Sequence, residues 1–322
     1  MSTDSEKKIS EKEKEIYDRQ IRVWGFKAQQ RIRNASVLLI GANALSGETA
    51  KNIVLAGVGE LNILESENRL VTQNDINSIF FLEQKDLGKK ILGAVKTYLA
   101  ELNPNVLVNT IEADLTATDS RLLKKQSAVC SCEATLAAQL FADRICRANN
   151  VCYLSGDVFG DSGVCFSDFG ESFVYSEKGK QSELRFSSLE DTLAFTETAP
   201  RRTLKNAMRR EKLYFRLIKL LYQFEHKNSR WPTPSDSPEI ERDLYSGSAQ
   251  SEFEFPAGEL KFLFDVSEFF VSLQRNSPNV AAILGGVLAQ EILKAAAGNA
   301  RPLQNWLFFG PLVGNSAVVL NL

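Results

Sequence analysis

The sequence predicts an α/β protein in which a doubly wound, mostly parallel sheet carries helices on both faces and one helical insertion. Two observations predict this fold. Short aliphatic runs alternate with helix-length amphipathic segments between residues 36 and 154, as in βαβ units joined into a parallel sheet. The chain also has 322 residues, 44% of them hydrophobic and 24% charged, which suits a single α/β core enlarged by an insertion.

The alternation follows an N-terminal helix. Residues 1–15 are rich in Lys and Glu, as in a flexible tail or a solvated first helix turn, and we expect a tail. Apolar residues then recur at helical spacing from Ile16 to Ile32. Asn103 and Pro104 end one of the later helices. Strands are expected at 36–40, 61–64, 106–111, 128–130 and 151–154, and helices at 44–56, 88–102 and 134–148.

The pattern changes after Gly156. Segments 163–166 and 172–175 predict antiparallel strands that extend the sheet, and a helix is expected at 204–227. Near the end, a helix at 280–297 contains Gly285 and Gly286, which permit close approach of another backbone. Strands are expected to follow at 306–309 and 317–320. The predicted organisation is a tail over 1–15, the main α/β domain over 16–175, the helical insertion over 176–275 and a return to the main domain over 276–322.

Charge and composition narrow the function. The 38 basic and 40 acidic residues give a formal charge of −2, so no global field favours nucleic acid or an anionic membrane as a partner. The sequence has no stretch of about 18 uninterrupted apolar residues, and the start of the chain lacks the apolar segment of a secretory signal; an intracellular protein is expected. The five cysteines form no CxxC pair, and the single histidine, His226, lies in a polar run. We therefore expect reduced, buried thiols, no metal site and no histidine-dependent catalysis.

The loop after the first expected strand has the position of a phosphate-binding loop but lacks its glycines. Such a loop needs glycines so that backbone amides can approach the phosphates at a helix N-terminus. Here residues 41–47 read Gly-Ala-Asn-Ala-Leu-Ser-Gly. Gly41 and Gly47 remain, but Asn43 and Ser46 place side chains where the phosphates would lie. We expect a degenerate loop that binds no cofactor.

Glu65 leaves a second function class open. It ends the second expected strand, where a carboxylate binds the ribose hydroxyls of a dinucleotide in folds of this kind. A solvated acid at a strand end is the alternative reading of the same residue. A dehydrogenase would also need an intact loop and a proton relay, and the sequence shows no such relay.

Three segments in order carry a family resemblance. Residues 17–25 read Tyr-Asp-Arg-Gln-Ile-Arg-Val-Trp-Gly, residues 156–160 read Gly-Asp-Val-Phe-Gly after the fifth strand, and residues 278–294 read Pro-Asn-Val-Ala-Ala-Ile-Leu-Gly-Gly-Val-Leu-Ala-Gln-Glu-Ile-Leu-Lys. Together they resemble the adenylation domains of enzymes that activate ubiquitin-like proteins, and within that family the small subunits of SUMO-activating enzymes. The resemblance covers nearly the whole chain and implies a Rossmann-like adenylation fold.

The resemblance also implies a division of labour. In that family one subunit binds ATP and Mg²⁺, adenylates the C-terminal glycine of the modifier and passes the acyl group to its own cysteine; the small subunit is a degenerate copy. Three functional positions of active members, an arginine, an ATP-contacting lysine and a metal-contacting aspartate, fall here on Ser78, Ile91 and Ala134. The chain is thus expected to bind neither ATP nor Mg²⁺. Both would be bound by its partner, the large catalytic subunit of the SUMO-activating enzyme. SUMO would be a partner of the chain through this complex.

Arg19 is the functional residue that the resemblance retains. It matches the arginine that family members extend across the dimer interface to the partner's ATP phosphates. A planar, permanently charged guanidinium delivered in trans can stabilise phosphate charge as an arginine finger does. Taken without the resemblance, Arg19 reads as a helix-surface arginine paired with Asp18 or another nearby acid.

The family also implies residence in the nucleus, with the cytoplasm as a second location. Two alternatives stay open at this point. The chain could be the small subunit for another ubiquitin-like modifier, or a binding scaffold that contributes nothing to catalysis.

Overall fold

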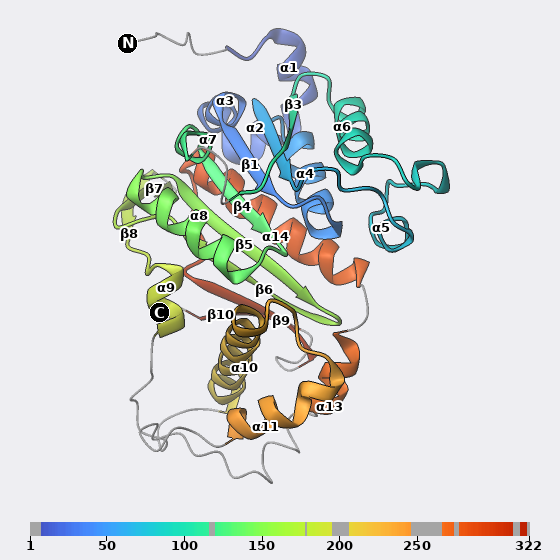
Figure 1. The fold of residues 1–322 in the computed structure, drawn as a ribbon. Helices are drawn as coiled ribbons and strands as arrows, with labels where there is room; N and C mark the ends of the chain where they lie inside the picture. The colour runs from blue at the N-terminus through green and yellow to red at the C-terminus, as the bar shows by residue number, and fades with distance from the viewer. Residues whose placement is uncertain are drawn as a thin grey trace.

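A computed structural model describes residues 8–115, 120–177, 179–194, 206–245, 266–273, 277–311 and 316–320 of the chain. Its centre is an eight-stranded sheet with the strand order β10-β9-β6-β5-β4-β1-β2-β3 (Figure 1). The strands of this sheet are β1 (Ser36–Ile40), β2 (Glu60–Glu65), β3 (Leu107–Glu112), β4 (Ala128–Cys132), β5 (Cys152–Phe159), β6 (Ser162–Asp168), β9 (Trp306–Gly310) and β10 (Ser316–Leu320).

The sheet is mostly parallel, as the sequence predicts. Strands β3, β2, β1, β4 and β5 pair in parallel, and β6, β9 and β10 extend the sheet in antiparallel fashion from β5. The C-terminal strands thus rejoin the main sheet, as expected. The helices around the sheet are α4 (Ala44–Leu55), α5 (Gln73–Ser78), α6 (Ile91–Leu102), α7 (Arg121–Lys124), α8 (Leu136–Ala148) and α14 (Pro278–Ala297).

Alternate residues of the central strands supply two separate cores. In β1, Val37 and Leu39 belong to the cluster that includes α4 and α14 residues. Leu38 and Ile40 belong to the cluster that includes residues of α8 and of α10 (Asn206–Asn228). Successive side chains of a strand point to opposite faces, so a strand buried on both faces needs an unbroken apolar run. This is why Ser-Val-Leu-Leu-Ile could be recognised as a strand from sequence.

The N-terminal region differs from the single helix expected after residue 16. It forms three short helices, α1 (Glu11–Ile16), α2 (Asp18–Trp24) and α3 (Phe26–Asn34). The break after α2 falls at Gly25, whose φ of +90° few side-chain-bearing residues adopt. Helical structure begins earlier than expected because Ser10 and Glu13 form a capping box and Glu13 pairs with Arg33 at 2.6 Å. Residues 11–15 therefore form a mostly solvated helix turn and not the expected tail, and residues 1–7 lie outside the described residues.

The segment expected to extend the sheet at 172–175 does not do so. Strand β7 (Phe173–Glu177) pairs with β8 (Lys180–Leu184) in a separate two-stranded sheet. To join the main sheet, β7 would have to pair with the edge of β6 that faces away from β5. That edge is already paired with β9. The expected boundary at residue 176 falls inside this hairpin.

The region expected as the helical insertion contributes helices after the hairpin. They are α9 (Leu189–Ala194), α10 (Asn206–Asn228), α11 (Ser237–Tyr245) and α13 (Val266–Ser272). Helices α10, α11 and α13 gather at the end of the molecule opposite α1–α3 (Figure 1). The predicted helix at 204–227 corresponds to α10, and its first two residues lie outside the described residues.

Helix α14 packs closely on α4. A Cβ added to Gly285 would lie 2.6 Å from the Cβ of Glu48 and 3.0 Å from the backbone nitrogen of Thr49. Gly285 therefore permits the close approach expected of it, whereas nothing lies within 4 Å of a Cβ on Gly286. By length and composition α14 could span a membrane, but half of its apolar window is buried in the protein, as for a core helix.

A buried carboxyl group joins the sheet to the insertion. Asp157 lies within β5, so the Gly-Asp-Val-Phe-Gly segment overlaps the strand that it was expected to follow. Its Oδ2 accepts hydrogen bonds from Tyr222 Oη in α10 at 2.5 Å and from Gln139 Nε2 in α8 at 2.9 Å. Burial raises the pKa of Asp157 to about 6, against the lowering effect of these two hydrogen bonds.

Asp157→Asn should change how stability depends on pH. The folded-state pKa of Asp157 lies above the unfolded value, so the contribution of this carboxyl group to stability falls as pH rises from about 4 to about 6. The neutral variant lacks this loss. We expect its free energy of unfolding, relative to wild type, to rise by roughly 3 kcal/mol across this window and to level off above it. Urea unfolding between pH 4 and 8 measures the difference. Asp161→Asn, which removes an exposed carboxylate from the adjacent turn, is the control. A difference for Asp157→Asn that does not vary with pH would contradict the prediction.

Candidate functional site

The topology marks one place where a ligand would be expected. The chain proceeds from β1 through β2 to β3 on one side and from β4 to β5 on the other. The crevice outside the carboxyl ends of β1 and β4 is thus a switch point, where open α/β sheets bind their ligands. Three features meet there: the loop 41–47 after β1, Glu65 at the end of β2, and Glu133 after β4.

Three backbone donors of this loop are bonded to side chains within the protein. Asn43 caps helix α4: its Oδ1 accepts from the Ser46 N–H at 2.9 Å, and Ser46 Oγ accepts from the Asn43 N–H at 2.9 Å. Glu65 Oε2 accepts from the Ala42 N–H at 2.8 Å. The amides of Ala42, Asn43 and Ser46 are therefore bonded to side chains of the chain itself and are not left for a phosphate.

Asn43 also spans the switch point. Its Nδ2 donates to the Cys132 carbonyl oxygen, at the end of β4, at 2.7 Å. Gly41 lies so close to the same carbonyl that an added Cβ would be 2.6 Å from the oxygen, and its φ is +101°. The loop after β1 and the end of β4 are thus drawn together by a side chain at a position where phosphate-binding loops carry glycine.

Glu65 fits neither of the two readings of its sequence position. Its Oε1 accepts from the backbone N–H and the hydroxyl of Ser66 at 2.8 and 2.9 Å, and Oε2 accepts from Ala42. Arg69 Nε lies 3.6 Å from Oε2. The carboxylate is therefore occupied in holding the loop.

The three positions that match functional residues of active enzymes offer no phosphate or metal ligand. Ile91 is completely buried at the start of α6. Ser78 Oγ donates to the Asn74 carbonyl within α5 at 2.7 Å, and Ala134 has no polar side chain. Beside Ile91, Lys89 pairs with Asp86 at 3.1 Å and Lys90 with Glu112 at 2.7 Å. The two lysines next to Ile91 therefore form ion pairs with acidic side chains at the surface.

Arg19 lies at the opposite end of α4 from the loop. Gln20, next to it in α2, donates from Nε2 to the Leu55 carbonyl at the C-terminus of α4 at 3.2 Å, whereas Asn43 caps the N-terminus. The 12 residues of α4 separate these ends by about 18 Å. The structure therefore does not bring Arg19 to the loop of its own chain.

Arg19 does not form the ion pair with Asp18 that its sequence neighbourhood suggests. Asp18 pairs with Arg22 instead, at 2.9 Å. Within the described ranges, Arg19 is exposed and makes no hydrogen bond or ion pair. Exposed apolar side chains lie near it in sequence: Ile16 is 53% exposed and Val23 82%. A free guanidinium beside exposed apolar residues suits a surface that another protein covers.

Comparison with known proteins agrees with this architecture. The model of the ThiF family matches residues 17–315. The chain belongs to the ThiF family. A crystal structure of E. coli MccB with succinimide shares the fold, with a TM-score of 0.56 and 13% identity over 95% of this ThiF-family chain and 71% of MccB. This confirms the predicted Rossmann-like fold.

Curated proteins named as subunits of SUMO-activating enzymes resemble the chain along its whole length. SUMO-activating enzyme subunit 1 of Dictyostelium discoideum is 29% identical, with 99% of this chain and 97% of that protein covered. Subunit 1B-1 of Arabidopsis thaliana is 31% identical, with 96% of each covered. The Homo sapiens subunit 1 is 29% identical, with 96% and 95% covered. The family resemblance that the three sequence segments carry is thereby confirmed.

The thiols and the histidine of this ThiF-family chain lie as the sequence suggests. All five cysteines are free and buried, and burial raises the pKa of Cys152 to about 12. His226 is exposed near the end of α10. Among the described residues, no group of three or more His, Cys, Asp or Glu side chains could hold a metal ion.

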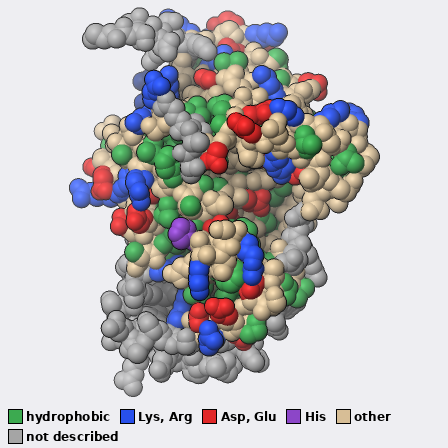
Figure 2. Space-filling model, viewed as in Figure 1, with side chains coloured by type: hydrophobic (Ala, Val, Ile, Leu, Met, Phe, Trp, Pro, Cys, Tyr) green, Lys and Arg blue, Asp and Glu red, His purple; other side chains and the backbone are tan. Residues whose placement is uncertain are grey.

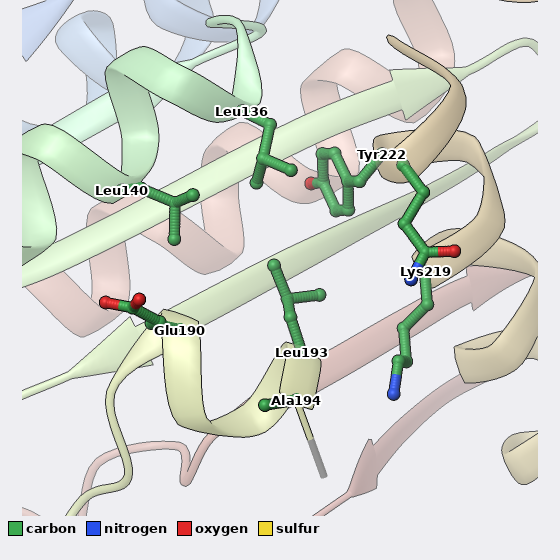
Figure 3. A pocket seen from close by; sticks show the side chains of 8 residues that line it. Leu136, Leu140, Glu190, Leu193, Ala194, Lys219 and Tyr222 are labelled. Carbon is green, nitrogen blue, oxygen red and sulfur yellow. The ribbon is translucent and has the colours of Figure 1, made fainter. Parts of the chain in front are cut away.

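A separate pocket of about 240 Å³ lies between α8, α9 and α10. The side chains of Leu136, Leu140 and Leu193 face it, with Glu190 and Lys219 farther out (Figure 3). None of the residues that line it belongs to the loop after β1. Its lining is mostly apolar, with Glu190, Lys219 and Gln223 as its charged and amide side chains.

Asn43→Ala should destabilise this ThiF-family chain, because it removes the N-cap of α4 and the bond to Cys132 together. We expect a loss of about 1–2 kcal/mol in the free energy of unfolding, measured in urea. Asn228→Ala is the control, since it removes an exposed asparagine that bonds only to its own helix, and we expect less than about 0.5 kcal/mol for it. Equal losses in the two variants would show that the asparagine does not hold the loop closed.

Proposed function

We propose that this chain is the small, non-ATP-binding subunit of a SUMO-activating heterodimer. In this role it supports the ATP-dependent adenylation of the modifier C-terminus and its thioester transfer on the large subunit, which binds ATP and Mg²⁺. The observation that carries the proposal is the arrangement around α4. At one end, Asn43 and Ser46 bond to each other's amides and Asn43 joins the loop to the end of β4, and Arg19 lies exposed at the other end.

The relatives support the choice of modifier. Full-length similarity to proteins named SUMO-activating enzyme subunit 1 favours SUMO over another ubiquitin-like protein. The word subunit in those names supports a partner chain. The proposed role also places the protein in the nucleus, with the cytoplasm as a second location.

The chemistry proposed for Arg19 needs only its guanidinium. Nucleotidyl transfer builds negative charge on the phosphates, and fixed cations at that place lower the barrier. Arginine supplies a charge that does not titrate at cellular pH and several donors in one plane. Its role would be to stabilise the phosphates of ATP held by the partner, without taking part in bond making.

The described part of one face of the molecule gives no competing indication of a polyanionic partner. Acidic and basic side chains are intermingled over the described part of the face shown in Figure 2, in keeping with a formal charge of −2 for the whole chain. Nucleic-acid binding usually leaves a one-sided basic patch. We propose neither nucleic acid nor membrane as a partner.

The heterodimer should be active where the single chain is not. Expressed alone, the chain should show no SUMO-dependent exchange of pyrophosphate into ATP. Coexpressed with the large subunit of a SUMO-activating enzyme, it should copurify as a heterodimer and form a SUMO thioester on that subunit. Large subunits for other ubiquitin-like modifiers serve as controls. Exchange by the isolated chain would overturn the proposal, and a thioester only with another modifier would assign the chain to that pathway.

Arg19→Ala should slow adenylation by on the order of tenfold or more while the heterodimer still forms. The measurement is single-turnover formation of the SUMO adenylate. Arg22→Ala removes the same charge one turn of the helix away and breaks only an exposed ion pair, so it should change the rate by less than about twofold. Arg19→Lys keeps the charge but not the planar fork and should restore the rate only in part. An unchanged rate for Arg19→Ala would leave the chain as a scaffold without catalytic contribution.

A further inference from the structure

Helix α2 needs anchoring if it is to present Arg19 at a fixed place. It has seven residues, none of them buried, and helices this short are not stable by themselves in water. A guanidinium that has to lie within hydrogen-bond distance of a phosphate stabilises it less if the helix that carries it moves. Misplacement of a catalytic group by about 1 Å can lower the rate on the order of a hundredfold. The anchor of α2 is therefore functionally important if Arg19 acts as proposed.

We propose that Tyr17 is the positioning residue for Arg19. This inference rests on the function proposed above and goes beyond it by assigning a role to a buried side chain that cannot touch the partner. Tyr17 is 1% exposed and links two helices through its backbone. Its N–H donates to the Glu13 carbonyl at 2.9 Å in α1, and its carbonyl accepts from the Ile21 N–H at 2.8 Å in α2.

The phenol of Tyr17 is fixed by residues far away in sequence. Its Oη accepts a hydrogen bond from Asn103 Nδ2 at 2.8 Å, and the same Nδ2 donates to the Val54 carbonyl of α4 at 2.8 Å. A Cβ added to Gly57 would lie 2.4 Å from Cζ of the phenol and 2.6 Å from Oη. The ring thus lies directly on the backbone after α4, in space that only a glycine leaves open. Asn103, at the end of α6, ties this position to a second core helix.

Two further contacts hold the same side of α2. Gln20 Nε2 donates to the Leu55 carbonyl at 3.2 Å. Trp24 Nε1 donates to Gln29 Oε1 at 2.8 Å, and Gln29 Nε2 donates to the Ala56 carbonyl at 2.8 Å. Tyr17, Gln20 and Trp24 follow one another at helical spacing, so they share one face. Arg19 and Val23, four residues apart, share another.

One face of α2 attaches the helix to the protein, and another face presents Arg19. Tyr17, Gln20 and Trp24 hold the helix on the end of α4, and Arg19 projects from the face left free. Tyr17 comes two residues before Arg19 and is the only one of the three contact residues that is buried. A change at Tyr17 should therefore alter the position of the guanidinium without altering the surface that meets the partner.

The test is a double-mutant cycle in the reconstituted heterodimer. Tyr17→Leu removes the ring and the hydroxyl, and we expect it to slow SUMO adenylation by on the order of tenfold, with the KM for ATP unchanged within about twofold. In the Arg19→Ala background the same substitution should change the rate by no more than about twofold, because the group that it positions is already absent. A purely structural role would lower the rate by the same factor in both backgrounds and would overturn the inference.

Matched variants separate an effect on the position of Arg19 from an effect of lost stability. Tyr153 is also completely buried, and its hydroxyl donates to Ser131 at 3.1 Å in the sheet. Tyr153→Leu should destabilise the chain to a similar degree, yet leave the rate per assembled heterodimer within about twofold of wild type. If Tyr17→Leu does not assemble, Tyr17→Phe removes only the bond to Asn103, and we expect a loss of roughly threefold that again vanishes in the Arg19→Ala background.

The outcomes separate this inference from the proposed function. A slow Arg19→Ala heterodimer with Tyr17 variants at the wild-type rate would overturn the positioning role and leave the function standing. An Arg19→Ala heterodimer at the wild-type rate would overturn the arginine's role and the positioning role with it. Both the proposed function and the positioning role would be supported if Tyr17 variants slow adenylation in the wild-type background and have no further effect in the Arg19→Ala background.

Discussion

The last carbonyl groups of helix α4 need hydrogen-bond donors, as those of every helix do, and the donors that this chain supplies determine much of its architecture. Asn103 donates to Val54, Gln20 to Leu55 and Gln29 to Ala56. Two of these donors come from the N-terminal helices and one from the end of α6. Satisfying one helix end thus fastens three segments to the core, including the segment that carries Arg19.

The other end of α4 has the opposite chemistry. There the donors are backbone amides, which in a nucleotide-binding loop would be left for phosphate. In this chain three of these amides are bonded to the side chains of Asn43, Ser46 and Glu65. These local bonds also stabilise the helix start, and the sheet around them keeps its parallel order.

The sequence predicted the parts of this structure that depend on periodicity. Apolar runs located the strands of the parallel sheet, and the missing glycines indicated a changed loop. It did not predict the three-way division of the N-terminal region, because the break at Gly25 depends on one backbone angle. It also did not predict the separate hairpin β7–β8, because pairing of β6 with β9 joins residues over 130 positions apart. The roles of Glu65 and Tyr17 depend on similar long-range contacts, which no spacing within the sequence reveals.

The closed loop has a consequence for how this protein stays folded. A ligand that binds only the native state adds to its stability in proportion to the logarithm of its concentration, so nucleotide-binding subunits gain support from the cellular ATP pool. In the role proposed for this chain, in which the partner binds the ATP, that support would be absent. Its folded population would then depend on intrinsic packing and on how much partner is present, which couples its lifetime in the cell to the supply of the other subunit.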